Sequence, residues 1–175
     1  MPCVYILCGY AFSGKTTLAK ALLEELDLVR VSIDEINTVR GVGLNNAWIT
    51  LEDWDLTYAE SYRQLAAYLQ AGRSVVYDAG NFNRAERDLA SLIAAQHNAK
   101  AQVVYITTSA EIVRQRWLSN RQTHKRGDVR DDYFEHGLAQ FEPPDDTEHP
   151  WFYRNEQDIH EWIVAHIAMI DESQR

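Results

Sequence analysis

The sequence predicts an α/β protein with a parallel sheet of about five strands and helices on both faces. Short apolar runs rich in β-branched and aromatic residues occur at 3–8, 28–33, 74–77 and 102–106, with a weaker run at 151–153. The first four runs are each followed by polar or glycine-containing residues and then by a helical pattern. This alternation requires right-handed crossovers that cover both faces of the sheet. Ligands of such sheets bind at the carboxyl ends of the strands.

Two segments carry the clearest helical periodicity. Residues 52–71 repeat apolar side chains at helical spacing, at Trp54, Tyr58, Tyr62, Leu65 and Leu69. Thr50 and Asp53 have the spacing of a capping box at the start of this helix, and Gly72 suits its end. Residues 157–170 show a second apolar stripe of the same kind. Both segments are therefore expected to pack as helices on the sheet.

Length and charge limit what the chain does. Its 175 residues, 46% of them hydrophobic, suit one ordinary domain with its own core, so we expect a single domain over 1–175. A formal net charge of −9 gives no general attraction to phosphate polymers, so any anion site must be local. The first apolar run lacks a basic flank and is too short for a signal or membrane helix. We therefore expect a cytoplasmic protein without a membrane partner.

The most specific motif, Gly9-Tyr-Ala-Phe-Ser-Gly14-Lys15-Thr16, matches G-x-x-x-x-G-K-[ST] between a predicted strand and a predicted helix. A glycine-rich turn can match this pattern by accident, but the setting favours a phosphate-binding loop (P-loop) on a helix amino terminus. Lys15 is expected to reach the β- and γ-phosphates and Thr16 to bind Mg²⁺. We thus expect a three-layer P-loop NTPase fold that uses ATP and Mg²⁺. The expected nucleotide contacts are Gly9, Tyr10, Ala11, Phe12, Ser13, Gly14, Lys15, Thr16 and Thr17.

A second metal ligand is predicted at the end of the third strand. The run Ser74-Val-Val-Tyr-Asp78 is apolar and ends in aspartate, so it resembles a Walker B strand. The alternative is a simple turn at Asp78-Ala-Gly-Asn, since Asp and Gly favour turns. The phosphate-binding motif itself requires an acidic partner for the metal, and this favours Asp78 as a Mg²⁺ ligand.

The remaining P-loop class is a small kinase, because the chain has no guanine-reading Asn-Lys-x-Asp, lacks a transporter signature and is short for a remodelling ATPase. Transfer to a hydroxyl is helped by a carboxylate that accepts the proton. Asp34 is predicted to end the second strand in Val31-Ser-Ile-Asp-Glu35 at the same sheet edge, which makes it the candidate base. Helix capping is its alternative role, and Glu35 is the substitute base.

Basic residues concentrate in residues 114–130, which hold six of the chain's 17 lysines and arginines. Kinases often place such arginines on a lid that closes over the phosphates and excludes water. The alternative is a solvated helix face. The lid interpretation assigns Arg116, Arg121 and Arg126 to stabilisation of the transferred phosphoryl group.

These stretches resemble the small P-loop kinases grouped with the kinase domain of phage polynucleotide kinase, chloramphenicol phosphotransferase and zeta toxins. The resemblance includes "GYAFSGKTTLA", "VSIDEIN", "SVVYDAGNFNRAERD", the arginine-rich segment and "FEPPDDTE", and covers most of residues 4–148. The chain is also similar to bacterial proteins labelled as kinases or AAA-family ATPases of unknown substrate. "FEPP" marks this family without indicating a chemistry.

The resemblance implies roles for further residues. Asp34 takes the place of the hydroxyl-activating aspartate, and Asp78 with Asn81 forms the D-x-x-N turn after the third strand. Arg84 and Arg87 match the arginines that follow this turn, although exposed charge in the first turns of a helix is the alternative.

The acceptor site departs from the polynucleotide kinases. Their acceptor-binding arginine, three residues after the aspartate, is Asn37 here, and Arg40 is a possible compensation. Trp48 lies outside the apolar stripe of the neighbouring helix and is a candidate for stacking on the acceptor.

We therefore expect a phosphotransferase that moves the γ-phosphate of Mg·ATP to a hydroxyl of a small molecule, with Asp34 as general base. The alternatives are a polynucleotide 5′-hydroxyl kinase, a nucleotide-sugar kinase like the zeta toxins, and an ATP-binding switch or interaction module without catalysis.

Overall fold

In the computed structural model of the protein, residues 1–43, 49–124 and 129–172 are described, with side chains up to residue 166. The sheet is parallel throughout, with strand order β2-β3-β1-β4-β5. The strands are β1 (Cys3–Cys8), β2 (Leu28–Ser32), β3 (Ser74–Asp78), β4 (Lys100–Ile106) and β5 (Trp151–Tyr153). The predicted parallel sheet is confirmed, including the weakly indicated fifth strand.

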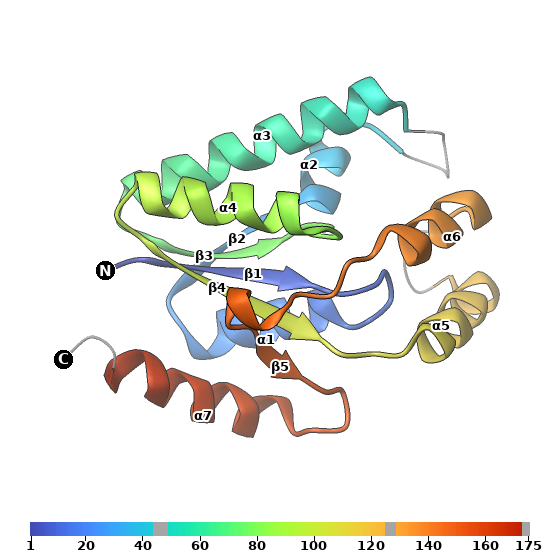
Figure 1. Cartoon of the computed structure of the whole chain (residues 1–175). Coiled ribbons are helices and arrows are strands. Elements are labelled where there is room, and N and C mark those ends of the chain that lie inside the picture. Colours follow the sequence, from blue (N-terminus) through green and yellow to red (C-terminus); the bar gives the residue numbers. More distant parts are fainter. Residues whose placement is uncertain (44–48, 125–128, 173–175) are drawn as a thin grey trace.

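Helices cover both faces of this sheet and project beyond one edge (Figure 1). They are α1 (Lys15–Glu25), α2 (Ile33–Arg40), α3 (Leu51–Gln70), α4 (Arg84–Gln96), α5 (Ala110–Thr123), α6 (Asp131–Gln140), α7 (Ile159–Glu172) and the short 3-10 helix η2 (Asp146–Glu148). Within the described ranges, no helix is both long and apolar enough to span a bilayer.

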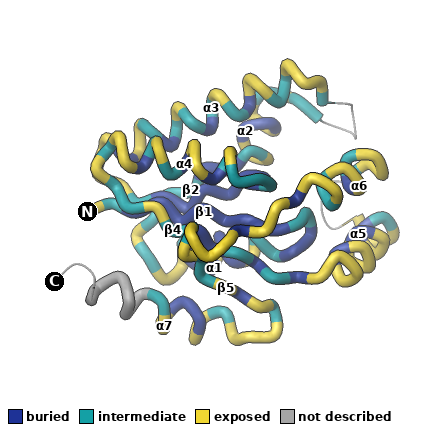
Figure 2. The backbone as a smooth tube through the Cα atoms, viewed as in Figure 1, coloured by how far each residue is buried: buried dark blue, intermediate teal, exposed yellow. Residues whose placement is uncertain are grey.

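The side chains of β1 show why its sequence is continuously apolar. Cys3, Tyr5 and Leu7 pack in the core formed with α1 and α7, whereas Val4, Ile6 and Cys8 pack in the core formed with α3 and α4. Successive residues of a strand point to opposite faces, and both faces are buried here. The buried residues accordingly concentrate along the central strands (Figure 2). The chain therefore has the predicted three-layer α/β fold.

The local signals at helix ends are confirmed at α3 and corrected at α2. The Thr50 hydroxyl accepts a hydrogen bond from the Asp53 amide at 3.0 Å, and Gly72 has a φ of 73° beyond the end of α3. At α2, the strand ends at Ser32, whose hydroxyl caps the helix, so Asp34 lies in the first turn of α2 instead of ending β2. A serine at this position satisfies a free helix amide and starts the helix earlier than the apolar run predicts.

Residues 114–123 of the arginine-rich segment belong to α5, which forms a helical hairpin with α6 beyond the carboxyl ends of the strands (Figure 1). Its small core contains Val113, Trp117 and Phe134 together with Phe12 of the loop after β1. The Trp117 and Phe134 rings stack with their centroids 4.2 Å apart. The hairpin is thus anchored directly to the loop that carries the phosphate-binding motif.

Candidate active site

The loop between β1 and α1 adopts backbone angles that few side chains tolerate. Gly9 and Gly14 have φ angles of 145° and 111°, and Phe12 also has a positive φ, of 63°. A Cβ on Gly9 would lie 2.9 Å from Ser13 Oγ and 3.0 Å from the Ile106 carbonyl oxygen. The first glycine of the motif is therefore required by both backbone angle and space.

The amino terminus of α1 is suited to an anion. Gly14 is the N-cap residue, no side chain caps the helix, and the first turn contains no acidic residue. The free amides and the helix dipole therefore favour a negative group here. Lys15 Nζ donates hydrogen bonds at 2.8 Å to the carbonyl oxygens of Gly9 and Tyr10, which hold its positive charge over the loop.

The two predicted metal ligands lie together. The Thr16 hydroxyl donates a hydrogen bond to Asp78 Oδ2 at 3.2 Å, although 62 residues separate them. Asp78 ends β3 as predicted and is 6% exposed. A hydroxyl and a carboxylate are oxygen ligands of the kind that Mg²⁺ takes beside phosphate oxygens and water, so this pair fits the metal expected with ATP.

Arg30 was missed by the sequence analysis, yet it holds Asp78 in place. Its Nη2 and Nε atoms lie 2.6 and 3.1 Å from Asp78 Oδ2, and its Nη1 atom lies 2.6 Å from Glu35. The Arg30 side chain is only 13% exposed. An arginine between the apolar residues of the strand Leu28–Ser32 was the available signal, because a charge buried there requires a carboxylate partner.

Asp34 and Glu35 occupy different surroundings although they are neighbours. Both are exposed in the first turn of α2. Glu35 forms an ion pair with Arg30, whereas no ion pair engages Asp34 within the described part of the chain. Asp34 is therefore the more available of the two candidate bases.

The arginines of the hairpin divide into two groups. Arg116 Nη1 donates to the carbonyl oxygens of Phe12 and Ser13 at 3.1 and 3.2 Å, so it contacts the phosphate-binding loop. Arg114 pairs with Glu135, and Arg121 pairs with Asp131 while its guanidinium lies 4.1 Å over the Trp117 ring. These two arginines connect α5 to α6. Arg126 lies outside the described residues.

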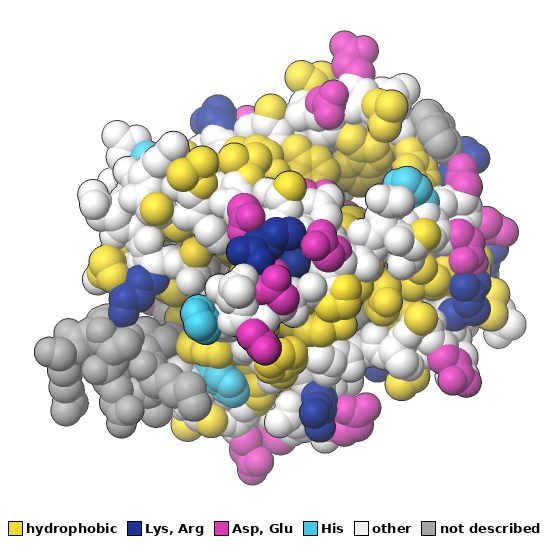
Figure 3. All heavy atoms as spheres, viewed as in Figure 1, with side chains coloured by type: hydrophobic (Ala, Val, Ile, Leu, Met, Phe, Trp, Pro, Cys, Tyr) yellow, Lys and Arg dark blue, Asp and Glu magenta, His cyan; other side chains and the backbone are white. Residues whose placement is uncertain are grey.

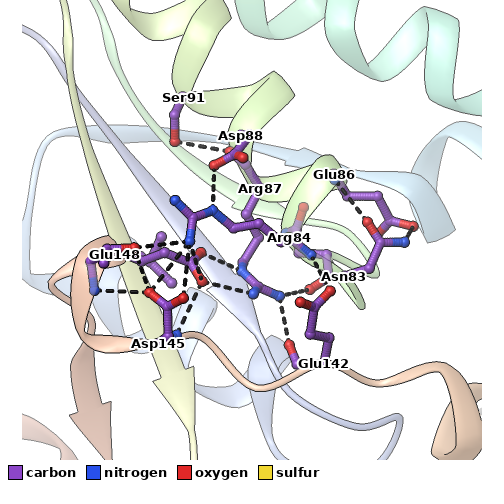
Figure 4. A network of polar contacts seen from close by, with 12 residues as sticks. Asn83, Arg84, Glu86, Arg87, Asp88, Ser91, Glu142, Asp145 and Glu148 are labelled. Atoms are coloured by element: carbon purple, nitrogen blue, oxygen red, sulfur yellow. Dashed lines mark hydrogen bonds and ion pairs between the residues drawn. The ribbon is translucent and has the colours of Figure 1, made fainter.

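The arginines after Asn81 bind residues 141–148, here called the strap (Figure 4). Arg87 is buried and forms two hydrogen bonds with Glu148, at 2.6 and 2.9 Å, and two more with the carbonyl oxygens of Asn81 and Glu142. Arg84 pairs with Asp88 and Asp145 at the surface. In the structure both arginines thus bind groups of the protein itself.

The "FEPP" sequence forms the first half of the strap and contacts two loops of the candidate site. The Phe141 ring lies 4.6 Å from the ring of Tyr10 in the phosphate-binding loop. The Glu142 amide donates to the Phe82 carbonyl oxygen at 2.7 Å, and its carboxylate accepts from the Arg84 amide at 3.0 Å. The strap therefore joins the end of the hairpin to two loops at the carboxyl edge of the sheet.

The other residues expected on the acceptor side also have internal partners. Asn81 donates its side-chain amide to the Leu7 carbonyl oxygen at 2.8 Å. Arg40 binds the carbonyl oxygen of Asp53 at 2.7 Å and the Thr57 hydroxyl, and this hydroxyl donates to the buried Asn37. These bonds fix α2 against α3. Trp48 lies outside the described residues.

Two groups, the buried Cys8 and the partly buried Tyr58, remain protonated at neutral pH. Burial raises the pKa of the Cys8 thiol to about 12, although Arg87 and Lys15 oppose the shift. Burial also raises the pKa of Tyr58, and the carboxylates of Glu86 and Asp34 act in the same direction. Tyr58 is therefore a neutral hydroxyl near Asp34, and Cys8 is not a thiolate nucleophile.

Comparison with known proteins assigns the chain to a family. A profile of the family described as AAA domain matches residues 4–144. None of the curated proteins compared with the chain matches it significantly.

Solved structures share the whole fold at low sequence identity. A presumed kinase from Chloroflexus aurantiacus has a TM-score of 0.76 and 21% identity, with coverage of 95% of this chain and 97% of the other. Kti12 from Chaetomium thermophilum, solved with ADP-AlF3, has a TM-score of 0.69 and 15% identity, with coverage of 98% of each chain. A gluconokinase from Sinorhizobium meliloti has a TM-score of 0.66 and 16% identity, with coverage of 99% of this chain and 95% of the other. The chain therefore belongs to the AAA domain family and has the P-loop fold found in these proteins.

Proposed function

We propose that the protein is a kinase that transfers the γ-phosphate of Mg·ATP to a hydroxyl of a small-molecule acceptor. The observation that carries this proposal is the convergence of Lys15, Thr16 and Asp78 at the carboxyl edge of the sheet, beneath an arginine-bearing hairpin. Family and fold support a phosphotransferase of the P-loop type. Bound Mg²⁺ would neutralise phosphate charge, and Thr16 and Asp78 would hold it.

In this mechanism the protein contributes position and charge. The amides of residues 9–17 would bind the phosphates, and Lys15 would stabilise the negative charge that spreads over the transferred group. Arg116 and Arg121 of the hairpin, together with Arg126, would add positive charge to the site as the lid closes. Asp34 would accept the proton of the attacking hydroxyl, and the exposure of its carboxylate on α2 supports this role.

The charge distribution supports a small acceptor over a nucleic acid. Binding a polynucleotide requires cations available to its phosphates. Arg40 and Arg84 both bind carboxylates of the protein itself, and Asn37 stands where polynucleotide kinases have an arginine. On the face viewed in Figure 3, the central basic side chains are likewise surrounded by acidic ones. A compact neutral or weakly charged acceptor fits this surface better.

The test is transfer of labelled γ-phosphate to a panel of nucleosides, sugars, antibiotics, nucleotide-sugars and oligonucleotide 5′ ends. We expect label on a small hydroxylated molecule, and we expect Asp34→Asn to reduce its rate about a hundredfold or more, because the general base is lost. Asp34→Asn and its control, Glu35→Gln, each alter an exposed side chain, so the unfolding midpoint of each variant should match that of the wild type.

Glu35→Gln is the matched control, since Glu35 is adjacent, exposed and engaged by Arg30. A large loss with Glu35→Gln and none with Asp34→Asn would move the base to Glu35. Label on oligonucleotide ends or on nucleotide-sugars alone would favour those acceptors. ATP binding without transfer to any member of a broad panel would favour a switch without catalysis.

A further inference from the structure

The carbonyl oxygen of Ser13, inside the phosphate-binding loop, accepts hydrogen bonds from three side chains. Thr108 Oγ1 and Asn155 Nδ2 each lie 2.9 Å from it, and Arg116 Nη1 lies 3.2 Å away. The donors come from the segments after β4 and β5 and from α5. Two loops and helix α5 therefore act on one peptide group.

The orientation of Asn155 in this cluster is determined by chemistry. A carbonyl oxygen only accepts hydrogen bonds, so the amide nitrogen of Asn155 must face Ser13. The second hydrogen of this nitrogen is donated to Thr108 Oγ1, whose own hydrogen goes to Ser13. The donors of both side chains are thus fully used. The Asn155 oxygen faces Gly14, where an added Cβ would lie 2.7 Å from it.

We propose that Asn155 is a positioning residue of the nucleotide site, which acts with Thr108 through the Ser13–Gly14 peptide. A trans peptide is planar, and its N–H points away from its C=O. Holding the Ser13 carbonyl oxygen against Thr108 and Asn155 therefore directs the Gly14 amide into the loop, toward the phosphates. This inference rests on the proposed function, since it assigns the amide to a bound polyphosphate.

Asn155 is not part of the phosphate-binding motif in the sequence. It follows β5, 142 residues after Ser13, and lies outside the stretch that matches the family profile. A residue near the phosphate-binding loop could instead contact the nucleotide base. The two roles differ in one respect, because a base contact does not alter the binding of a polyphosphate that has no base.

The experiment measures the affinity for Mg·ATP and for Mg·tripolyphosphate by calorimetry, in the wild type, Asn155→Ala and Thr108→Val. We expect each variant to weaken both ligands about tenfold, because one hydrogen bond that orients the phosphate-binding amide is lost. The double variant should lose little more than the larger single loss, because both side chains act on the same carbonyl. Glu156→Gln, an exposed neighbour, is the matched control and should bind like the wild type.

An unchanged tripolyphosphate affinity in both variants would overturn the proposal, and a loss confined to ATP would assign Asn155 to the base instead. A merely structural role would lower the unfolding midpoint without altering either affinity at low temperature, which would also overturn it. If Asn155→Ala does not fold, Thr108→Val gives the same measurement. A wild type that binds neither ligand would instead refute the proposed function, and this inference with it.

Discussion

Lys15→Ala is expected to lower the rate of phosphoryl transfer by about a thousandfold or more, because it removes the cation that the proposed mechanism places at the developing phosphate charge. In the structure the ammonium group is held over the loop by the carbonyl oxygens of Gly9 and Tyr10. Stabilisation by a group already in position is worth most in the transition state, so the loss should appear mainly in kcat. Steady-state kinetics with the acceptor identified by the labelling panel measure it.

Lys20→Ala is the matched control for this variant. Lys20 lies on the same helix α1, is exposed, and carries the same charge five residues further on. It should leave both kcat and KM close to the wild-type values. Equal activity of Lys15→Ala and the wild type, with both proteins folded, would remove Lys15 from the catalytic site and with it the basis of the proposed mechanism.

Local patterns predicted most of the fold because each depends on neighbouring residues. Alternation of apolar runs and helical stripes predicted the parallel sheet, and the spacing of Thr50 and Asp53 predicted the start of α3. The phosphate-binding motif predicted an acidic partner at the end of β3, and the Thr16–Asp78 hydrogen bond confirms that the two meet. A motif of this kind specifies its own local structure, so its role can be predicted from the sequence without three-dimensional information.

Contacts between residues far apart in the sequence could not be predicted from local patterns. Arg87 and Glu148 are 61 residues apart, and no local pattern indicates that an arginine in a helix binds the strap instead of a substrate. Asn155 has no motif around it, so its contact with Ser13 became visible only in the fold. Arg30 was closer to prediction, because a charge within an apolar strand always needs a partner. What remained open was the identity of that partner.

The strongest effect on stability is expected from Arg87→Leu. Arg87 is 1% exposed and Glu148 is 5% exposed, so removing the guanidinium leaves a carboxylate buried beside a leucine. Breaking a buried pair on one side costs about 3–5 kcal/mol, which is a large part of the stability of a typical domain. The carbonyl oxygens of Asn81 and Glu142 lose a donor as well. Urea unfolding of the variant and the wild type measures the difference in free energy.

Two further variants separate the cost of an unpaired charge from the worth of the ion pair. Arg84→Leu removes an arginine of the same helix whose side chain is 36% exposed and lies 3.7 Å from Glu148, farther than Arg87 does, and it should cost below about 1 kcal/mol. Arg87→Leu combined with Glu148→Leu should recover much of the lost stability, because two apolar side chains replace both desolvated charges. A single Arg87→Leu variant as stable as Arg84→Leu would show that the strap is not held by this pair. A double variant no more stable than the single one would instead place the loss in the carbonyl contacts of Arg87, which hold the loop after β3 and thereby the position of Asn81.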